Sequence, residues 1–180
     1  MNETKTEYAT FGGGCFWCVE AIYELADGVL ATESGYTGGA VQNPSYGQIC
    51  TGQTGHAEVV RVTYDPQKTS YQKLLDIFFD THNPTTLNRQ GNDVGTQYRS
   101  AVFYHSPKQK AAADQTISKL DASGEFENPI VTKVEPAAEF YKAERYHQDY
   151  FAQNPNASYC RFVVKPKVDK FKNQQKAEAE

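Results

Sequence analysis

Residues 8–25, YATFGGGCFWCVEAIYEL, decide the fold. Residues 8–11 are typical of a short β-strand, which runs into Gly12-Gly13-Gly14. From residue 16 to residue 25 the apolar side chains are spaced to cover one face of a helix. A strand, a glycine turn and a helix in this order present backbone N–H groups at one point, as anion-binding helix starts do. The stretch predicts an α/β unit with Cys15 where the glycine turn meets the helix.

Strand and helix patterns alternate along the rest of the chain. We expect strands at residues 29–36, 58–64, 100–104 and 130–135, and helices at residues 71–80, 106–122 and 144–152. Such alternation predicts an α+β protein, a two-layer α/β sandwich with a split βαβ motif and a mixed sheet. Two long loops, 37–55 and 81–99, interrupt the pattern, and loops of this length are usually functional.

The length and composition are those of one globular domain. The chain has 180 residues, of which 39% are hydrophobic and 22% charged. We therefore expect a single catalytic domain over residues 1–180, with a core at about 5–165. Residues 166–180 are rich in Lys, Gln and Glu, and we expect them to be a mobile polar tail that frays beyond about Lys172.

Charge and hydropathy exclude several kinds of partner. The formal net charge of -4 argues against a nucleic-acid partner, which a basic face would bind. The chain contains no apolar run of the ~18 residues that a membrane span requires. The N-terminus lacks a basic start followed by an apolar stretch, so no secretory signal is visible. We expect a cytoplasmic monomer.

Cys15 is the first candidate for chemistry. At the start of a helix, a thiolate is stabilised by the helix dipole and by free N–H groups, so we expect a lowered pKa. Phe16 and Trp17 place two large rings beside the sulfur, which favours a pocket wall. The alternative is a buried cysteine among core aromatic residues.

Two further cysteines are candidate partners of Cys15. Cys18 follows three residues later, a spacing that permits a disulfide or half of a zinc site. The other Cys and His residues are scattered, so we expect no metal. Cys160 lies close to the polar tail, where a movable thiol can condense with a sulfenic acid. Its alternative is burial in a terminal strand, since Phe162-Val163-Val164 follow.

Two polar stretches offer the remaining candidates. Glu58 stands where a glycine-rich loop enters a strand, and a partly buried carboxyl there suits a general acid. A solvated glutamate is the alternative, and His56 is a rival acid or a loop residue satisfied by hydrogen bonds. In residues 83–99, Asp93 and Tyr98 can hydrogen-bond a ligand from opposite sides, unless the stretch is an Ω-loop packed by its own side chains.

Together these motifs resemble the peptide methionine sulfoxide reductase A family. Their order and spacing match over residues 11–160, and the combination is specific although each motif alone is weak. The similar stretches are GCFW (14–17), SGY (34–36), TG through GHAE (51–58), NRQGND through GTQYRS (88–100) and YHQ (146–148).

The resemblance implies a role for each candidate. Cys15 matches the family's nucleophile and Glu58 its acid. The positions that hold the sulfoxide oxygen and the substrate correspond to Tyr46, Asp93 and Tyr98, and those of the methyl pocket to Phe16 and Trp17. The family reduces the S epimer of methionine sulfoxide, free or in proteins, in protein repair and oxidative-stress defence. It uses no cofactor, is recycled by thioredoxin, and has a fold similar to a ferredoxin-like sandwich with additions.

The chain departs from many family members at two places. Cys18 stands where many have glycine, and the stretch after Cys160 lacks the glycine-rich tail with a further cysteine. Cys160 matches the usual resolving position, and Cys18 is a nearer alternative. Two other classes stay open on the residues alone: a general dithiol–disulfide oxidoreductase that uses Cys15 and Cys18, and a zinc-binding interaction module.

Overall fold

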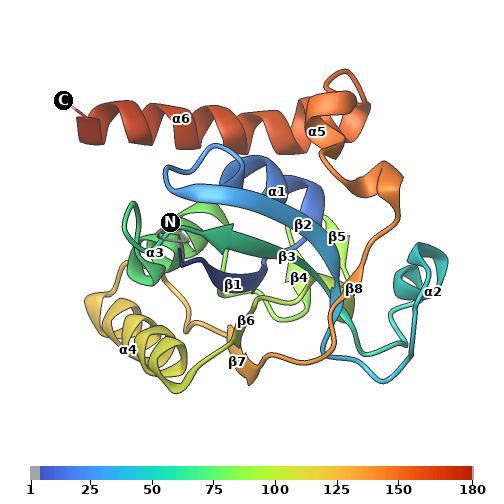
Figure 1. The fold of residues 1–180 in the computed structure, drawn as a ribbon, viewed down its shortest axis with the longest axis horizontal. Coiled ribbons are helices and arrows are strands. Elements are labelled where there is room, and N and C mark those ends of the chain that lie inside the picture. Colours follow the sequence, from blue (N-terminus) through green and yellow to red (C-terminus); the bar gives the residue numbers. More distant parts are fainter. Residues whose placement is uncertain (1–4, 180) are drawn as a thin grey trace.

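A six-stranded mixed sheet forms the centre of the protein (Figure 1). The computed structural model describes residues 5–179. The sheet has the order β7-β6-β1-β3-β2-β8. Its strands are β1 (Glu7–Gly12), β2 (Val29–Thr37), β3 (Ala57–Tyr64), β6 (Ala101–Tyr104), β7 (Lys133–Pro136) and β8 (Tyr141–Lys142). Only β6 and β7 pair in parallel, and every other pair in this sheet is antiparallel.

The ferredoxin-like core predicted from the sequence is confirmed. Helix α1 (Phe16–Tyr23) connects β1 to β2, and helix α3 (Tyr71–Thr81) connects β3 to β6. In space these strands lie in the order β6-β1-β3-β2, so each helix crosses over one intervening strand. This arrangement is the split βαβ motif, used twice.

The helices cover one face of the sheet. The alternation of β3 turns Glu58, Val60 and Val62 towards the helices and Val59 away from them. On the helical face, the ring of Phe11 stacks between the rings of Tyr23 and Phe78 at centroid distances of 5.3 and 5.0 Å. These buried rings join β1 to α1 and α3, and they fix where α1 begins.

The opposite face of the sheet has a smaller core. Ala57, Val59, Ala101 and Phe103 are buried there, with Phe140 packed against them. None of these residues belongs to a helix, so the protein has two layers, the sheet and the helices on its other face.

Helix α4 (Pro107–Ser123) agrees closely with the sequence prediction. Ser106 caps its N-terminus by accepting a hydrogen bond from the Gln109 N–H at 3.2 Å, and Pro107 occupies the first helical position. Gly124, in the left-handed conformation, ends the helix.

The two long loops contain short elements. Residues 37–55 include helix α2 (Tyr46–Cys50), which stands apart from the helical layer at the right of Figure 1. Residues 81–99 include a hairpin of β4 (Arg89–Gln90) and β5 (Asp93–Val94), followed by the 3₁₀ turn η1 (Thr96–Tyr98).

The C-terminal third departs from the sequence predictions at two elements, and it excludes the alternative of a terminal strand at Cys160. The helix expected over 144–152 is instead two short pieces, η2 (Arg145–His147) and α5 (Tyr150–Gln153), because Asp149 adopts a positive φ of 54° between them. The strand expected over 130–135 begins only at Lys133. Cys160 lies in a π-helical turn, η3 (Cys160–Val164), and not in a terminal strand.

The polar tail expected at 166–180 is a helix. Helix α6 (Lys165–Ala179) continues from η3 and lies across α1 (Figure 1). Val168 and Phe171 are buried on one face of it, in line with Val164 of η3. The mostly Lys, Gln and Glu residues around them hide this narrow apolar stripe in the sequence. No helix within residues 5–179 is long and apolar enough to cross a membrane.

Candidate active site

Cys15 occupies the N-cap position of α1 and is 8% exposed. The Cys18 N–H donates to the Cys15 carbonyl at 3.1 Å and closes the first turn of the helix. Gly14 precedes Cys15 with a φ of 94°, and a Cβ on it would lie 2.7 Å from the Gln90 side chain. Only glycine fits that position, so the glycine turn seats the thiol at the helix start.

Glu58 faces this thiol from the start of β3. Its Oε1 accepts a hydrogen bond from the N–H of Phe16, the residue after Cys15, at 3.2 Å. The carboxyl is 1% exposed, and its Oε2 has no hydrogen-bond partner among the described residues. Burial raises the pKa of Glu58 to about 8. The carboxyl therefore holds a proton at neutral pH, as a general acid must.

The pKa of Cys15 moves in the direction opposite to the one that the sequence predicted. Burial raises it well above the ordinary value, and the neighbouring Glu58 raises it further. A hydrogen bond from the Trp17 N–H opposes these effects but does not outweigh them. At neutral pH, Cys15 and Glu58 are thus a thiol beside a carboxylic acid.

Two tyrosine hydroxyls lie near the same carboxyl. Tyr46 opens α2 and Tyr98 ends η1. Burial raises the pKa of both tyrosines, and the charge of Glu58 is the next cause in each case. Both hydroxyls remain protonated and can donate to a polarised oxygen between them and Glu58. The structure thus brings Tyr46 and Tyr98 together with Cys15 and Glu58.

Asp93 reaches the site from the β4–β5 hairpin. Its Oδ2 accepts a hydrogen bond from the Tyr159 hydroxyl at 2.6 Å. The same hydroxyl lies 4.0 Å from the Cys18 sulfur. Tyr159 therefore connects the hairpin to the start of α1.

Phe16 and Trp17 form the aromatic side of the site. Phe16 is fully buried and packs against Tyr36 and His147, with ring centroids 5.7 and 5.1 Å apart. Trp17 is half-buried, stacks on Tyr150 at 3.7 Å and meets Tyr159 edge-on at 5.5 Å. Phe16 is part of the core, whereas Trp17 is only partly buried.

Sequence reasoning missed three residues that support these side chains. Besides Tyr159, the missed residues are Glu144 and His147. Glu144 accepts hydrogen bonds from the Tyr46 N–H at 2.9 Å and from the Tyr36 hydroxyl at 3.0 Å. His147 accepts one from the Trp17 indole N–H at 3.0 Å. The only sequence signal was the stretch YHQ (146–148), which the resemblance included without a role.

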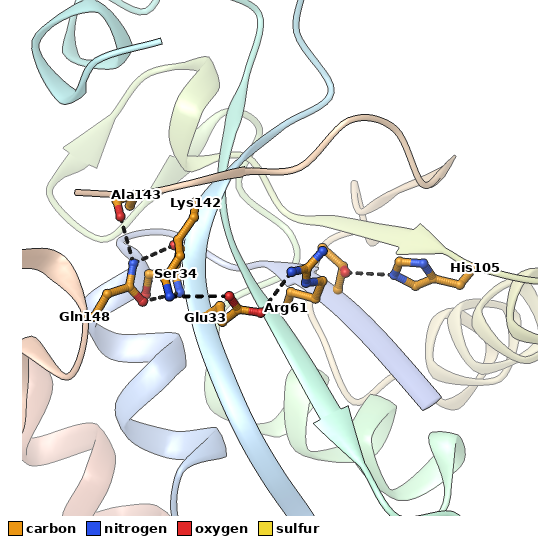
Figure 2. Close-up of polar contacts among 8 residues, drawn as sticks. Glu33, Ser34, Arg61, His105, Lys142, Ala143 and Gln148 are labelled. Carbon is orange, nitrogen blue, oxygen red and sulfur yellow. Dashed lines mark hydrogen bonds and ion pairs between the residues drawn. The ribbon is translucent and has the colours of Figure 1, made fainter. Parts of the chain in front are cut away.

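The side chain of Gln148 fastens this stretch to β2, as Figure 2 shows. Its Oε1 accepts from the Ser34 N–H at 2.9 Å, and its Nε2 donates to the Ser34 carbonyl at 2.9 Å and the Ala143 carbonyl at 3.0 Å. Gln148 thus pairs with the strand as another backbone segment would. These hydrogen bonds also restrain the position of the preceding residue, His147.

His56 is not placed to act as the acid. Its Nδ1 accepts from the Gly39 N–H at 3.0 Å, and its Nε2 lies 2.6 Å from the Val41 carbonyl. Both ring nitrogens of His56 therefore hold the 37–55 loop. Of the two candidate acids, His56 and Glu58, only Glu58 remains.

The cysteines differ in burial. Cys18 and Cys160 are buried at 3% and 0% exposure, and Cys50, at the end of α2, is exposed. Burial raises the pKa of Cys18 to about 11. Within residues 5–179, the one group of three close metal-ligating side chains is Glu20, Glu24 and Asp149, and it includes neither Cys15 nor Cys18.

A buried cysteine facing a protonated carboxyl and two tyrosine hydroxyls, on a ferredoxin-like sandwich, defines a thiol-dependent oxidoreductase. The sequence profile of the family "Peptide methionine sulfoxide reductase" matches residues 7–180. This chain belongs to that family, as the sequence resemblance predicted, and it is an enzyme of that class.

Named relatives agree over most of the chain. The peptide methionine sulfoxide reductase MsrA of Leptospira borgpetersenii serovar Hardjo-bovis (strain L550) is 55% identical over 165 residues, which cover 92% of this chain and 93% of that one. The structure of Mxr1 from Saccharomyces cerevisiae in reduced form superposes with a TM-score of 0.82 at 36% identity, over 88% of this chain and 91% of that one. A structure of Mxr1 in complex with Trx2 superposes with a TM-score of 0.59 at 28% identity, over 83% and 87%.

Proposed function

We propose that this protein reduces methionine S-sulfoxide, free or in proteins, with Cys15 as nucleophile and Glu58 as general acid. The observation that carries the proposal is the hydrogen bond that anchors the Glu58 carboxyl to the backbone next to Cys15. The Phe16 N–H holds the protonated Glu58 carboxyl beside the thiol of the preceding residue. Disulfide exchange alone would not require a buried acid at that place.

The first step transfers oxygen from the substrate to Cys15. Glu58 donates its proton to the sulfoxide oxygen while the Cys15 sulfur attacks the sulfoxide sulfur. Tyr46 and Tyr98 hydrogen-bond the oxygen as its charge develops. Methionine leaves as the thioether, Cys15 becomes a sulfenic acid, and the thiol proton of Cys15 restores the Glu58 carboxyl.

Substrate orientation falls to the remaining candidates. Trp17, which is partly exposed, binds the methyl group together with Phe16, and Asp93 binds a polar group on the other side. Because the two sides differ in polarity, only one epimer at sulfur directs its oxygen to Glu58. This asymmetry is the basis for selecting the S epimer.

A second thiol then closes the cycle. Cys160 condenses with the sulfenic acid to a disulfide and releases water, with Cys18 as the alternative. A dithiol reductant restores both thiols. The complex of yeast Mxr1 with Trx2 supports thioredoxin as that reductant. We place this single catalytic domain in the cytoplasm, as a monomer that repairs oxidised proteins during oxidative stress.

Turnover of separated S and R epimers of a blocked methionine sulfoxide tests the function. With a dithiol present, we expect reduction of the S epimer and none of the R epimer. Reduction of insulin disulfides without turnover of the S epimer would instead establish a general dithiol–disulfide oxidoreductase.

Disulfide mapping tests the resolving cysteine. After one turnover without reductant, we expect peptides that link Cys15 to Cys160. The Cys18→Ser variant should give the same link, and the Cys160→Ser variant should accumulate sulfenic acid. Finding only a Cys15–Cys18 link would reject Cys160.

A further inference from the structure

His147 lies at the centre of the aromatic side of the site. It is 1% exposed. Its ring has four aromatic neighbours at centroid distances of 4.1 to 5.7 Å: Phe16, Trp17, Tyr46 and Tyr146. Two of these, Phe16 and Trp17, are candidates for the methyl pocket, and Tyr46 is a candidate for holding the oxygen. The mechanism above uses His147 in no step.

The hydrogen bond to Trp17 determines the tautomer of this histidine. An indole N–H can only donate, so Nδ1 of His147 must accept at 3.0 Å and cannot carry a proton. The proton of the neutral ring is therefore on Nε2, which has no partner among residues 5–179. A protonated ring would place N–H against N–H and break the bond to Trp17.

The surroundings keep His147 neutral. Burial lowers its pKa, although the nearby carboxyl of Glu144 opposes the shift. The other elements around the ring present only uncharged groups to it: Phe16 and Trp17 from α1, Tyr46 from α2 and Tyr146 from its own turn. A neutral ring keeps the Nδ1 lone pair available to Trp17 at neutral pH.

We propose that His147 is a positioning residue that fixes the indole of Trp17 and thereby the shape of the methyl pocket. This inference rests on the proposed function and extends it. Gln148 supplies the rigid support, because its side chain binds the backbone of β2 on both sides of Ser34 (Figure 2). The indole is thus held on its edge by His147 and on its face by Tyr150.

Two substitutions of His147 distinguish its role as a hydrogen-bond acceptor from the packing of its ring. In His147→Asn, the side-chain oxygen lies where Nδ1 was and can accept from Trp17. In His147→Gln, the amide extends towards the position of Nε2, and the acceptor beside Trp17 is lost. Both variants lose the ring, so a purely structural role would affect them alike.

The chain offers a direct probe because Trp17 is its only tryptophan. The ¹⁵N-labelled protein has a single indole N–H resonance. We expect it to move upfield and to exchange faster with water in His147→Gln, and to stay close to the wild-type position in His147→Asn. In the wild type it should move when the pH is lowered far enough to protonate His147, below the ordinary range of histidine, and in His147→Asn it should not. His105→Gln, at the far end of the network in Figure 2, is the matched control and should leave the resonance in place.

Kinetics then test the consequence for the pocket. We expect His147→Gln to raise KM for the S-sulfoxide roughly three- to tenfold, the usual range for one hydrogen bond, with kcat within about twofold. His147→Asn should restore KM. An unchanged indole resonance in His147→Gln would overturn the proposal, and so would a shifted resonance with unchanged KM. Failure of the proposed function itself would appear separately, as no turnover of the S epimer by the wild type.

Discussion

The two sides of the site are built in different ways. The nucleophile side, Cys15 and Glu58, is held by the start of helix α1 and the start of the central strand β3, which are joined by one hydrogen bond from the Phe16 N–H. The C-terminal segment, residues 144–164, contains only short helical turns and reaches the site through the side chains of Glu144, His147 and Tyr159. The difference teaches that the sheet positions the reacting groups, while the C-terminal segment shapes the pocket around them. Substitutions on the nucleophile side should change kcat. Substitutions in the C-terminal segment should change KM and how often that segment opens.

Replacing the nucleophile should have the largest effect. In Cys15→Ser the hydroxyl cannot accept the sulfoxide oxygen, so we expect no methionine to form. The measurement is methionine released per enzyme in a single turnover without reductant. Cys50→Ser, at an exposed thiol, should release the wild-type amount. Methionine formation by Cys15→Ser would show that another residue is the nucleophile.

Glu58→Gln comes next on the same side. The amide keeps the shape and can still accept from the Phe16 N–H, but it has no acidic proton. We expect kcat to fall about 10²–10⁴-fold, the usual contribution of a general acid, with KM changed far less. Alkylation of Cys15 by iodoacetamide should continue in this variant. A rise in KM with an unchanged kcat would instead place Glu58 among the residues that bind the substrate.

Glu58 should also destabilise the fold as the pH rises. Its folded pKa of about 8 lies above its unfolded value near 4.5, so the folded state binds more protons between these limits and loses stability as the pH increases. Glu58→Gln should therefore be the more stable protein at pH 8, by on the order of 4 kcal/mol. Urea unfolding at pH 5 and pH 8 measures the difference. A difference that does not grow between these values would contradict the raised pKa.

Glu33 is the matched control for that pH effect. Its carboxyl pairs with Arg61 at 2.9 Å and with Lys142 at 3.5 Å, and these cations lower its pKa. The sign is reversed here. The stabilisation is present above the unfolded pKa and is lost as the pH falls through the folded one. Glu33→Gln should be the less stable protein at pH 8, by less than about 1 kcal/mol because the pair is at the surface.

On the C-terminal segment, Tyr159→Phe should have the smallest effect. The ring can keep its contact with Trp17, but the hydrogen bond to Asp93 is lost. We expect the segment to open more often and Cys160 to be alkylated roughly tenfold faster in the native protein. Cys18→Ser in the same background removes the neighbouring thiol from the measurement. An unchanged alkylation rate would show that the Tyr159–Asp93 bond does not hold the segment.

The sequence predictions were correct where the spacing of apolar residues along a short stretch indicates a helix or a strand. The apolar spacing of 16–25 and the alternation of 58–64 placed α1 and β3 to within two residues. The pairing of Glu58 with Cys15 followed only from the family resemblance, because no local pattern brings together residues 43 positions apart. Helix α6 was missed because only Val168 and Phe171 mark its buried face.

The supporting residues had no such pattern. A single His147 or Tyr159 gives no period, and its partners Trp17 and Asp93 lie 130 and 66 positions away. Asp149 takes a backbone conformation that aspartate adopts only occasionally, so nothing in the sequence separated η2 from α5. These features depend on tertiary contacts, which only the structure provides.

The π-helical turn at residues 160–164 determines how the side chains before it are rotated about the helix axis relative to those after it. The Lys165 N–H donates to the Cys160 carbonyl, five residues back, and Pro166 follows with no N–H to continue a regular helix. The turn therefore contains one residue more than an α-helix would use. Deleting a single residue there would leave an unbroken helix but rotate Tyr159 and Cys160 by about 100° relative to Phe171. The added residue is what allows one continuous rod to present Tyr159 to Asp93 at one end and Phe171 to the core at the other.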